Sequence, residues 1–269
     1  MRAARALATL DEVELGDHVC WRMRQTGGSL ADTRAFVADG ALYGDKIVIV
    51  GSTGAVSRIP RDAGPAVSVV VDVPGAADAD FVLAAVRREA RTAVREGFRS
   101  VRVLNERTPP KPVPGAEEEL LAQELKLDQF ASESGAIVVC AVTPSGWDAS
   151  TLEHMACVHP HEVGMRAEHP AFRMFSTGAD SWSVDGVIDS QCAPVFSAAV
   201  RAAALRVPTL TLRFDTVDMI DAAGMHALVD AVRGLPDRRV LVEGANDTVR
   251  LCWNLAGYAT SDTAVVMGA

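Results

Sequence analysis

The sequence predicts an α/β protein of two units, a mostly parallel sheet domain over residues 1–166 and a small α/β sandwich over residues 171–269. Three observations predict it. Short β-branched runs such as residues 46–50 (KIVIV) alternate with segments of helical apolar spacing. Strands separated by helices of this length form βαβ units with parallel pairing. The length of 269 residues favours two modest domains.

In the first unit, each strand is a short apolar run bounded by a turn or helix signal. The run at residues 46–50 is closed by Gly51, and the helix at residues 78–96 is amphipathic and stops at Gly97. Four prolines within residues 108–115 indicate a loop before the next helix. We expect strands at 18–23, 46–50, 67–73, 101–104 and 136–142, and helices at 30–43, 78–96 and 117–132.

The second unit has the size of a complete small domain. Asp221 stands where the N-cap of a helix belongs, and Gly224 would let another backbone approach the first turn of that helix. We expect strands at 172–175, 182–188, 209–214 and 239–243, and helices at 191–205, 222–233 and 247–255.

Composition excludes several classes of function. A net charge of −9 without a concentrated basic face, and an aromatic content of 5%, argue against nucleic-acid binding. No run of 18 apolar residues occurs, so we expect no membrane span. The five cysteines are odd in number and scattered, and residues 1–10 contain no apolar targeting segment. We therefore expect a cytoplasmic protein with reduced thiols.

The most specific stretch is residues 209–257. In it a buried strand runs into Asp221-Ala222-Ala223-Gly224 at the start of a helix, and a last helix ends in Leu255-Ala256-Gly257-Tyr258. Together with the earlier segment VDGVID at residues 184–189, this order resembles the STAS domain of anti-sigma factor antagonists. The resemblance covers residues 171–269 and implies a STAS-type α/β sandwich.

The STAS resemblance implies a docking surface around the start of the helix at Ala222. In the family, a serine directly after the aspartate is phosphorylated by an anti-sigma kinase, and the phosphate releases the partner. Here the matching position is Ala222, so the serine switch cannot operate there. The implied partner is an anti-sigma factor or a serine kinase of the HATPase type. Its expected contacts are Asp215, Asp218, Asp221, Ala222, Ala223, Gly224 and Met225.

The first unit resembles the MEDS family of sensory domains in several stretches that follow the family's order. They are His18-Val19-Cys20, FVADG at 36–40, GDKIVIV at 44–50, PGAE at 114–117, Glu124, 137–140 and VHP at 158–160. The resemblance implies a RecA-like core that binds a small molecule, with His18, Cys20 and Glu124 as candidate ligand contacts. Two departures alter that expectation. Gln123 replaces an aromatic residue before Glu124, and residues 141–143 lack a tyrosine that the family often has.

Nucleotide hydrolysis is not supported. Gly51-Ser52-Thr53-Gly54 follows a strand as a phosphate loop would, but residues 55–58 (AVSR) lack the lysine and hydroxyl pair that the loop needs. No serine lies in a nucleophile elbow, and no CxxC supports redox chemistry. We expect no enzymatic activity and no cofactor.

Four residues with metal-ligating side chains lie close together in sequence: His154, Cys157, His159 and His161. The MEDS resemblance accounts for His159, and a helix C-terminus with histidines near the dipole explains the group without a metal. We therefore expect no metal, with these four as weak candidates that His18 and Cys20 could join only through the fold.

The resulting hypothesis is a cytoplasmic signalling regulator. Its first unit senses a small ligand or a partner, and its second unit binds the anti-sigma factor or kinase. A scaffold that self-associates, for instance as a homodimer, is one alternative. A metal or redox sensor built on the histidines and cysteines is another.

Overall fold

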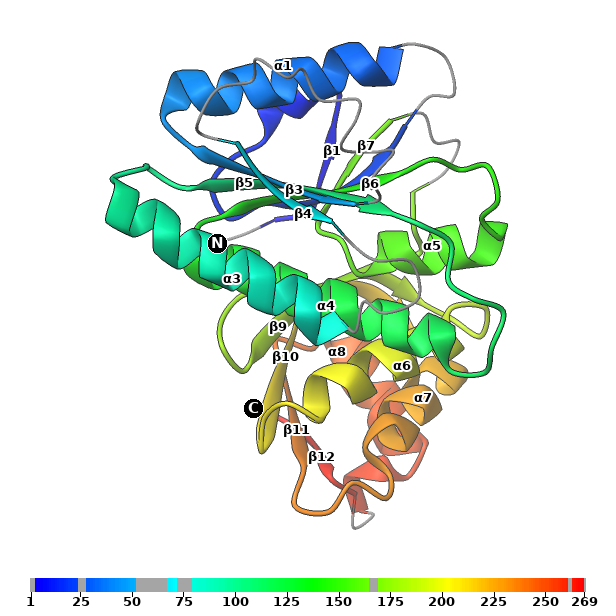
Figure 1. The fold of residues 1–269 in the computed structure, drawn as a ribbon. Helices are drawn as coiled ribbons and strands as arrows, with labels where there is room; N and C mark the ends of the chain where they lie inside the picture. Colours follow the sequence, from blue (N-terminus) through cyan, green and yellow to red (C-terminus); the bar gives the residue numbers. More distant parts are fainter. Residues whose placement is uncertain are drawn as a thin grey trace.

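The computed structural model describes residues 3–23, 28–51, 67–71, 79–164, 169–260 and 263–268. Its strands form two sheets, one of seven strands and one of five. Figure 1 shows the first sheet in the upper part of the molecule and the second sheet below it, with helix α4 (Ala116–Ser134) between them. Among the described residues, no helix combines the length and apolar character needed to cross a bilayer.

The first sheet has the strand order β1-β7-β2-β6-β5-β3-β4, and every pairing in it is parallel. Its face toward α1 (Gly28–Tyr43) holds an apolar core that includes Phe36 and Val37. The opposite face is covered by α3 (Ala79–Glu96), α4 and α5 (Ala149–Cys157) (Figure 1). The strands are β1 (Arg5–Leu7), β2 (His18–Arg22), β3 (Lys46–Gly51), β4 (Val67–Val71), β5 (Val101–Arg107), β6 (Ile137–Val142) and β7 (His161–Val163).

The second sheet is mixed, with the order β12-β11-β10-β9-β8. Only the pairing of β8 with β9 is antiparallel among these described strands. Its strands are β8 (Phe172–Ser176), β9 (Ser181–Ile188), β10 (Thr209–Ile220), β11 (Arg239–Glu243) and β12 (Val265–Met267). Its helices are α6 (Ala193–Ala204), α7 (Ala222–Val232) and α8 (Asp247–Leu255). Short 3-10 turns lie at Leu10–Glu12 and Tyr258–Thr260.

The apolar cores of the two units are continuous. Leu121 and Leu125 of α4, Cys157 at the end of α5 and Val158 after it belong to the same apolar core as the second sheet. Helix α4 packs against both α6 and β8. Buried side chains from both units share this core. The division of the chain into residues 1–166 and 171–269 therefore remains a prediction.

The α/β class, a parallel sheet domain followed by a smaller α/β unit, is confirmed. The RecA-like classification stays a prediction. Every strand and helix predicted from apolar runs is present where the structure describes the chain. The ends at residues 72–73 and 78, and the loop at residues 52–58, lie outside the described residues. The predictions missed the three-residue strands β1, β7 and β12, which are too short to show a period. No bounds were predicted for helix α5, although a helix C-terminus was expected near its histidine.

Strand β10 is longer than predicted. It runs to Ile220 instead of ending at residue 214, with register shifts against β9 between Arg213 and Thr216 and between Val217 and Met219. Irregular pairing of this kind breaks the alternation of buried and exposed side chains. Asp215 and Asp218 therefore lie within the strand, where both are exposed.

A buried carboxylate fixes the amino end of β3. The side chain of Asp45 is fully buried and accepts hydrogen bonds from Arg99 Nε and Nη2 and from Arg102 Nε, each at 2.8 Å. Burial alone would raise the pKa of Asp45, but the two guanidinium groups outweigh it and the pKa is lowered. The Arg102 guanidinium also lies 5.5 Å from the ring centre of Phe36 on α1.

The substitution Asp45→Asn should destabilise the fold by about 3 kcal/mol, because it leaves the guanidinium of the buried Arg102 without its counter-charge. The folded pKa of Asp45 lies below the unfolded value, so its contribution is complete above that value and is lost as pH falls through the folded pKa. Urea denaturation at pH 7 and below about pH 4 would measure both effects. The exposed Asp32→Asn on α1 is the control. Equal stability of the two variants at pH 7 would contradict this account.

Candidate functional site

A cluster of four polar side chains is completely buried beneath α4, and we call it the buried cluster. His18 begins β2, Cys140 lies in β6, Glu124 projects from the middle of α4, and His159 lies between α5 and β7. All four have no exposed surface. The parallel pairing of β2 with β6 places Cys20 opposite Cys140. His18, two residues before Cys20, lies on the same face of the sheet because alternate residues of a strand share a face.

The donor atoms of the buried cluster converge on one point. Glu124 Oε2 lies 3.4 Å from His18 Nε2, 3.4 Å from His159 Nε2 and 3.1 Å from Cys140 Sγ. Cys140 Sγ lies 3.4 Å from His18 Nε2, and the two imidazole rings stack with centres 4.0 Å apart. One ligating atom from each residue lies within 4.8 Å of all the others. This donor set can hold a transition-metal ion.

Each histidine has its other ring nitrogen next to an oxygen. His18 Nδ1 lies 3.5 Å from Asp128 Oδ1, one turn along α4 from Glu124. His159 Nδ1 lies 2.7 Å from the carbonyl oxygen of Met155. Because a carbonyl oxygen only accepts, Nδ1 of His159 carries the proton, and its Nε2 presents a lone pair to the cluster.

The two remaining members also have fixed partners. Glu124 Oε1 lies 2.8 Å from Arg107 Nε at the end of β5. Asn105 Nδ2, two residues earlier on the same strand, points at Cys140 Sγ at 3.8 Å. Arg107, Asn105 and Asp128 were not predicted as site residues. Only the register of β5 beside β6 and one helical turn of α4 bring them to the site.

Burial and charge set the protonation of the buried cluster. Burial would raise the pKa of Glu124, but the surrounding cationic groups, the Arg107 guanidinium foremost, hold it well below its usual range. Burial and the Glu124 carboxylate raise the pKa of Cys140 well above its ordinary value, so without a cation it stays a thiol. Burial lowers the pKa of His18, but Asp128 and Glu124 outweigh it and raise that pKa. Burial and the charge on His18 lower the pKa of His159. A buried thiol with a raised pKa is a poor nucleophile, which argues against covalent catalysis.

The structure brings together His18 and Glu124, two of the three predicted ligand contacts. Cys20 lies beside them, buried, and burial raises the pKa of its thiol to about 12. The four weak metal candidates do not form one group among the described residues. His159 joins the buried cluster, whereas His154 Nδ1 pairs with Glu117 Oε1 at 2.7 Å. The other two point elsewhere, because His161 pairs with Asp17 and Cys157 packs in the apolar core.

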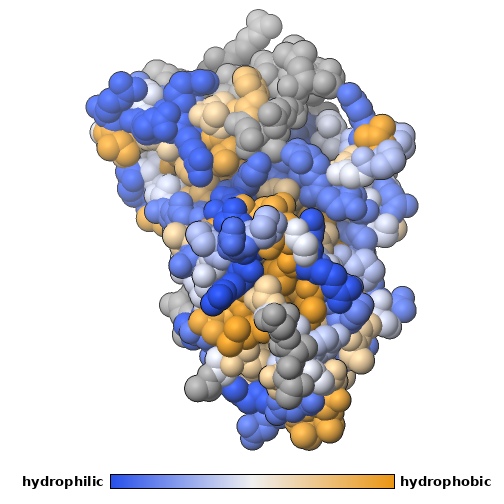
Figure 2. Space-filling view, turned by 90° about the horizontal axis from the view of Figure 1, so that it is seen from below, coloured by the Kyte–Doolittle hydropathy of each residue, from blue (hydrophilic) through white to orange (hydrophobic). Residues whose placement is uncertain are grey.

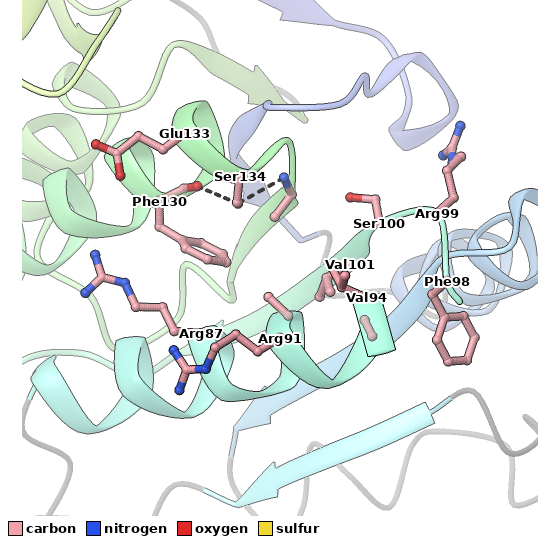
Figure 3. Close-up of a pocket in the computed structure, with 13 residues that line it drawn as sticks. Arg87, Arg91, Val94, Phe98, Arg99, Ser100, Val101, Phe130, Glu133 and Ser134 are labelled. Carbon is pink, nitrogen blue, oxygen red and sulfur yellow. Dashed lines mark hydrogen bonds between the residues drawn. The ribbon is translucent and has the colours of Figure 1, made fainter. Parts of the chain in front are cut away.

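A surface pocket of about 330 Å³ lies elsewhere on the first unit, between α3 and α4. Figure 3 shows Arg87 and Arg91 of α3 and Phe130, Glu133 and Ser134 of α4 around it. Its volume is at the lower end of the range of about 300–1,000 Å³ that small-molecule sites occupy. None of the residues that line it was predicted, because they meet only when the two helices pack.

The start of α7 in the second unit forms an exposed corner. Asp221 caps the helix, with one carboxylate oxygen accepting from Gly224 N at 2.8 Å and the other from Ser190 N at 3.0 Å. Ala222, the first helical residue, is exposed, and Ala223 is half-buried. The capping role that the sequence predicted for Asp221 is present in the structure.

Two of the predicted partner contacts are not on the surface. Met225 is 1% exposed and packs in the core of the second sheet, and Gly224 is also buried. A Cβ atom on Gly224 would lie 2.8 Å from side-chain carbons of Ile188 and Ile220. Gly224 therefore allows α7 to approach β9 closely, and it has no surface to offer a partner.

Exposed apolar side chains accompany this corner on the second unit. Figure 2, seen from the end of the molecule where the second unit lies, shows apolar groups gathered between hydrophilic ones. Met219, at the end of β10, is 45% exposed. Large exposed apolar side chains elsewhere in the second unit are Leu205, Leu251, Leu255 and Val266. Exposed apolar groups rimmed by polar ones are typical of docking surfaces.

The family model described as "MEthanogen/methylotroph, DcmR Sensory domain" (MEDS) matches residues 17–160. This stretch is more than half of the chain and contains every member of the buried cluster. The chain therefore belongs to the MEDS family, which confirms the resemblance noted for the first unit.

Among solved structures, the C-terminal part is similar to the anti-sigma factor antagonist SpoIIAA in its unphosphorylated form. The match has 18% sequence identity and a TM-score of 0.27, and it covers 32% of this chain and 83% of that one. No curated protein matches the chain at a significant level.

The substitution Gly224→Ala should destabilise the second unit by about 1–3 kcal/mol, because the added methyl group would overlap Ile188 and Ile220. Thermal unfolding followed by circular dichroism would measure the loss. Ala222→Ser, two residues earlier on the exposed side, should leave stability within about 0.5 kcal/mol. A Gly224→Ala protein as stable as wild type would show that α7 does not approach β9 as described.

Proposed function

We propose that this protein is a signalling regulator in which the MEDS unit senses a small ligand or a partner and a STAS-type second unit docks a signalling protein. The partner we propose is an anti-sigma factor or a serine kinase of the HATPase type. The observation that carries this proposal is the exposed start of α7, where Asp221 caps the helix and Ala222 presents a bare methyl group.

The chemistry of this corner favours a partner that brings positive and apolar groups. Asp215 and Asp218 on β10 are both exposed, and Met219 between them and the helix is an exposed apolar side chain. Complementary charge steers association, while a central apolar contact supplies most of the affinity. The proposed contact surface is therefore Asp215, Asp218, Met219, Asp221, Ala222 and Ala223.

Ala222 sets the mode of control. A phosphoserine directly after the N-cap would add about 1.5–2 negative charges at a helix N-terminus, and an alanine cannot accept phosphate. We propose instead that control reaches this surface from the first unit through α4. That helix borders the α3–α4 pocket, carries Glu124 of the buried cluster and packs on α6 of the second unit.

The substitution Ala222→Arg should weaken complex formation with an anti-sigma kinase by at least about tenfold, because it places a long cation at the centre of the proposed surface. Isothermal titration calorimetry would give the affinity, and size exclusion with light scattering the stoichiometry.

The matched control is Ala149→Arg. Ala149 is also exposed, is the first residue of α5 and directly follows an aspartate N-cap, so both variants have the same effect on the helix dipole. Equal affinities of wild type and Ala222→Arg would contradict the proposed surface. A tight homo-oligomer that takes up no kinase would favour the scaffold function instead.

A further inference from the structure

The buried cluster contains two electron-rich atoms that face each other without a proton between them. His159 Nδ1–H donates a hydrogen bond to the Met155 carbonyl oxygen, so its Nε2 carries a lone pair instead of a proton. Within the part of the chain that the structure describes, that Nε2 has no hydrogen-bond partner. It lies 3.4 Å from Glu124 Oε2, and both residues are completely buried. A buried acceptor that faces a carboxylate is costly unless a cation lies between them.

Four of the six spacings between the donor atoms are close to the edges of a tetrahedral metal site. Bonds of about 2.0–2.3 Å to a central ion give edges of about 3.3–3.8 Å between ligand atoms. Four of the six separations among His18 Nε2, Glu124 Oε2, Cys140 Sγ and His159 Nε2 are 3.1 to 3.4 Å, and the other two are within 4.8 Å. Small side-chain movements, largest along the two longer separations, would therefore accommodate an ion.

Each candidate ligand also has a supporting group of the kind that orients metal ligands. Metal-bound histidines donate their second nitrogen to a carboxylate or a backbone carbonyl. His18 has Asp128 in that position, and His159 has the Met155 carbonyl.

The other two candidate ligands are supported in the same way. Arg107 holds the second oxygen of Glu124, and the amide of Asn105 points at the sulfur of Cys140. Hydrogen bonds of this kind fix the orientation of a ligating carboxylate and stabilise a thiolate.

We propose that His18, Glu124, Cys140 and His159 bind one divalent transition-metal ion of the zinc class. Two imidazole nitrogens, one thiolate and one carboxylate form a closed set of four ligands, as in structural zinc sites. The nitrogen and sulfur ligands disfavour calcium and magnesium. On binding, the Cys140 thiol releases its proton and becomes the thiolate ligand, and a charged His18 releases the proton on its Nε2 to solvent.

Such an ion would link the first sheet to the segments that contact the second unit. His18 and Cys140 belong to the first sheet, whereas Glu124 lies on α4 and His159 on the link before β7. From the second unit, Arg173 Nη1 donates to the His159 carbonyl oxygen at 2.7 Å. An influence of the metal on docking rests on the proposed function, but the site itself does not.

The test uses the full chain, purified under reducing conditions, stripped with a chelator and then incubated with zinc or cobalt. After removal of free ions, elemental analysis should give about one ion per chain, and zinc should raise the melting temperature. Cobalt should give visible bands of a tetrahedral site and an ultraviolet charge-transfer band from the Cys140 thiolate.

His159→Ala and Cys140→Ala should abolish the bound metal and the zinc-dependent rise in melting temperature. Cys20→Ala is the matched control, because Cys20 is an equally buried cysteine in register with Cys140 but is not in the ligand set. Asp128→Asn should weaken zinc binding by about 10–100-fold.

Wild-type protein that retains less than a tenth of an equivalent and shows no cobalt bands would overturn the proposal, whatever the folding of the variants. Bound cobalt without a thiolate band, or equal loss of metal in Cys20→Ala and Cys140→Ala, would also overturn it. None of these readouts involves a signalling partner, so this proposal can fail while the proposed function stands.

Discussion

The carboxylate of Glu124 is the group on which the arrangement of the first unit depends. It lies completely buried on α4, where β2, β6, the end of β5 and the α5–β7 link converge. A charge in such a place is stable only if every surrounding group is oriented toward it. The register of three parallel strands and the rotation of one helix are thus fixed together, because a shift of one residue in any strand would turn its polar side chain to the other face.

Helix α4 carries this constraint into the second unit. One turn beyond Glu124, Asp128 Oδ2 accepts the amide of Ser176 in β8 at 2.5 Å. The next residue, Gln129, donates to the Ala179 carbonyl oxygen at 3.0 Å and accepts from Arg206 after α6. Apolar residues of the same helix complete the core beneath α6. A change in the buried cluster that moves α4 must therefore also move or strain β8 and α6, since close-packed interiors transmit displacement.

Much of the fold could be predicted from sequence, because buried parallel strands are short apolar runs and the long helices keep a clear period. The N-cap at Asp221 could also be predicted, since an N-cap depends on the few residues around the start of the helix. Only part of the buried cluster could be predicted from the sequence. The MEDS resemblance drew on His18, Glu124 and His159 and on the stretch 137–140 that ends in Cys140, but Cys140 was not predicted as a site residue, and neither were Arg107 and Asp128. Their roles depend on register and helix rotation, which no local pattern encodes. Gly224 and Met225 were expected on the docking surface, because the sequence does not show which face of the first turn of α7 meets β9.

We infer that the MEDS unit and the second unit are mechanically joined through α4. Amide hydrogen exchange tests it most directly, when wild type is compared with Glu124→Gln and with the exposed control Glu118→Gln on the same helix. Glu124→Gln should speed exchange at the Ser176 amide and in α6, far from the substituted side chain, whereas Glu118→Gln should change neither. Faster exchange confined to the first sheet and α4, with β8 and α6 unchanged, would contradict it.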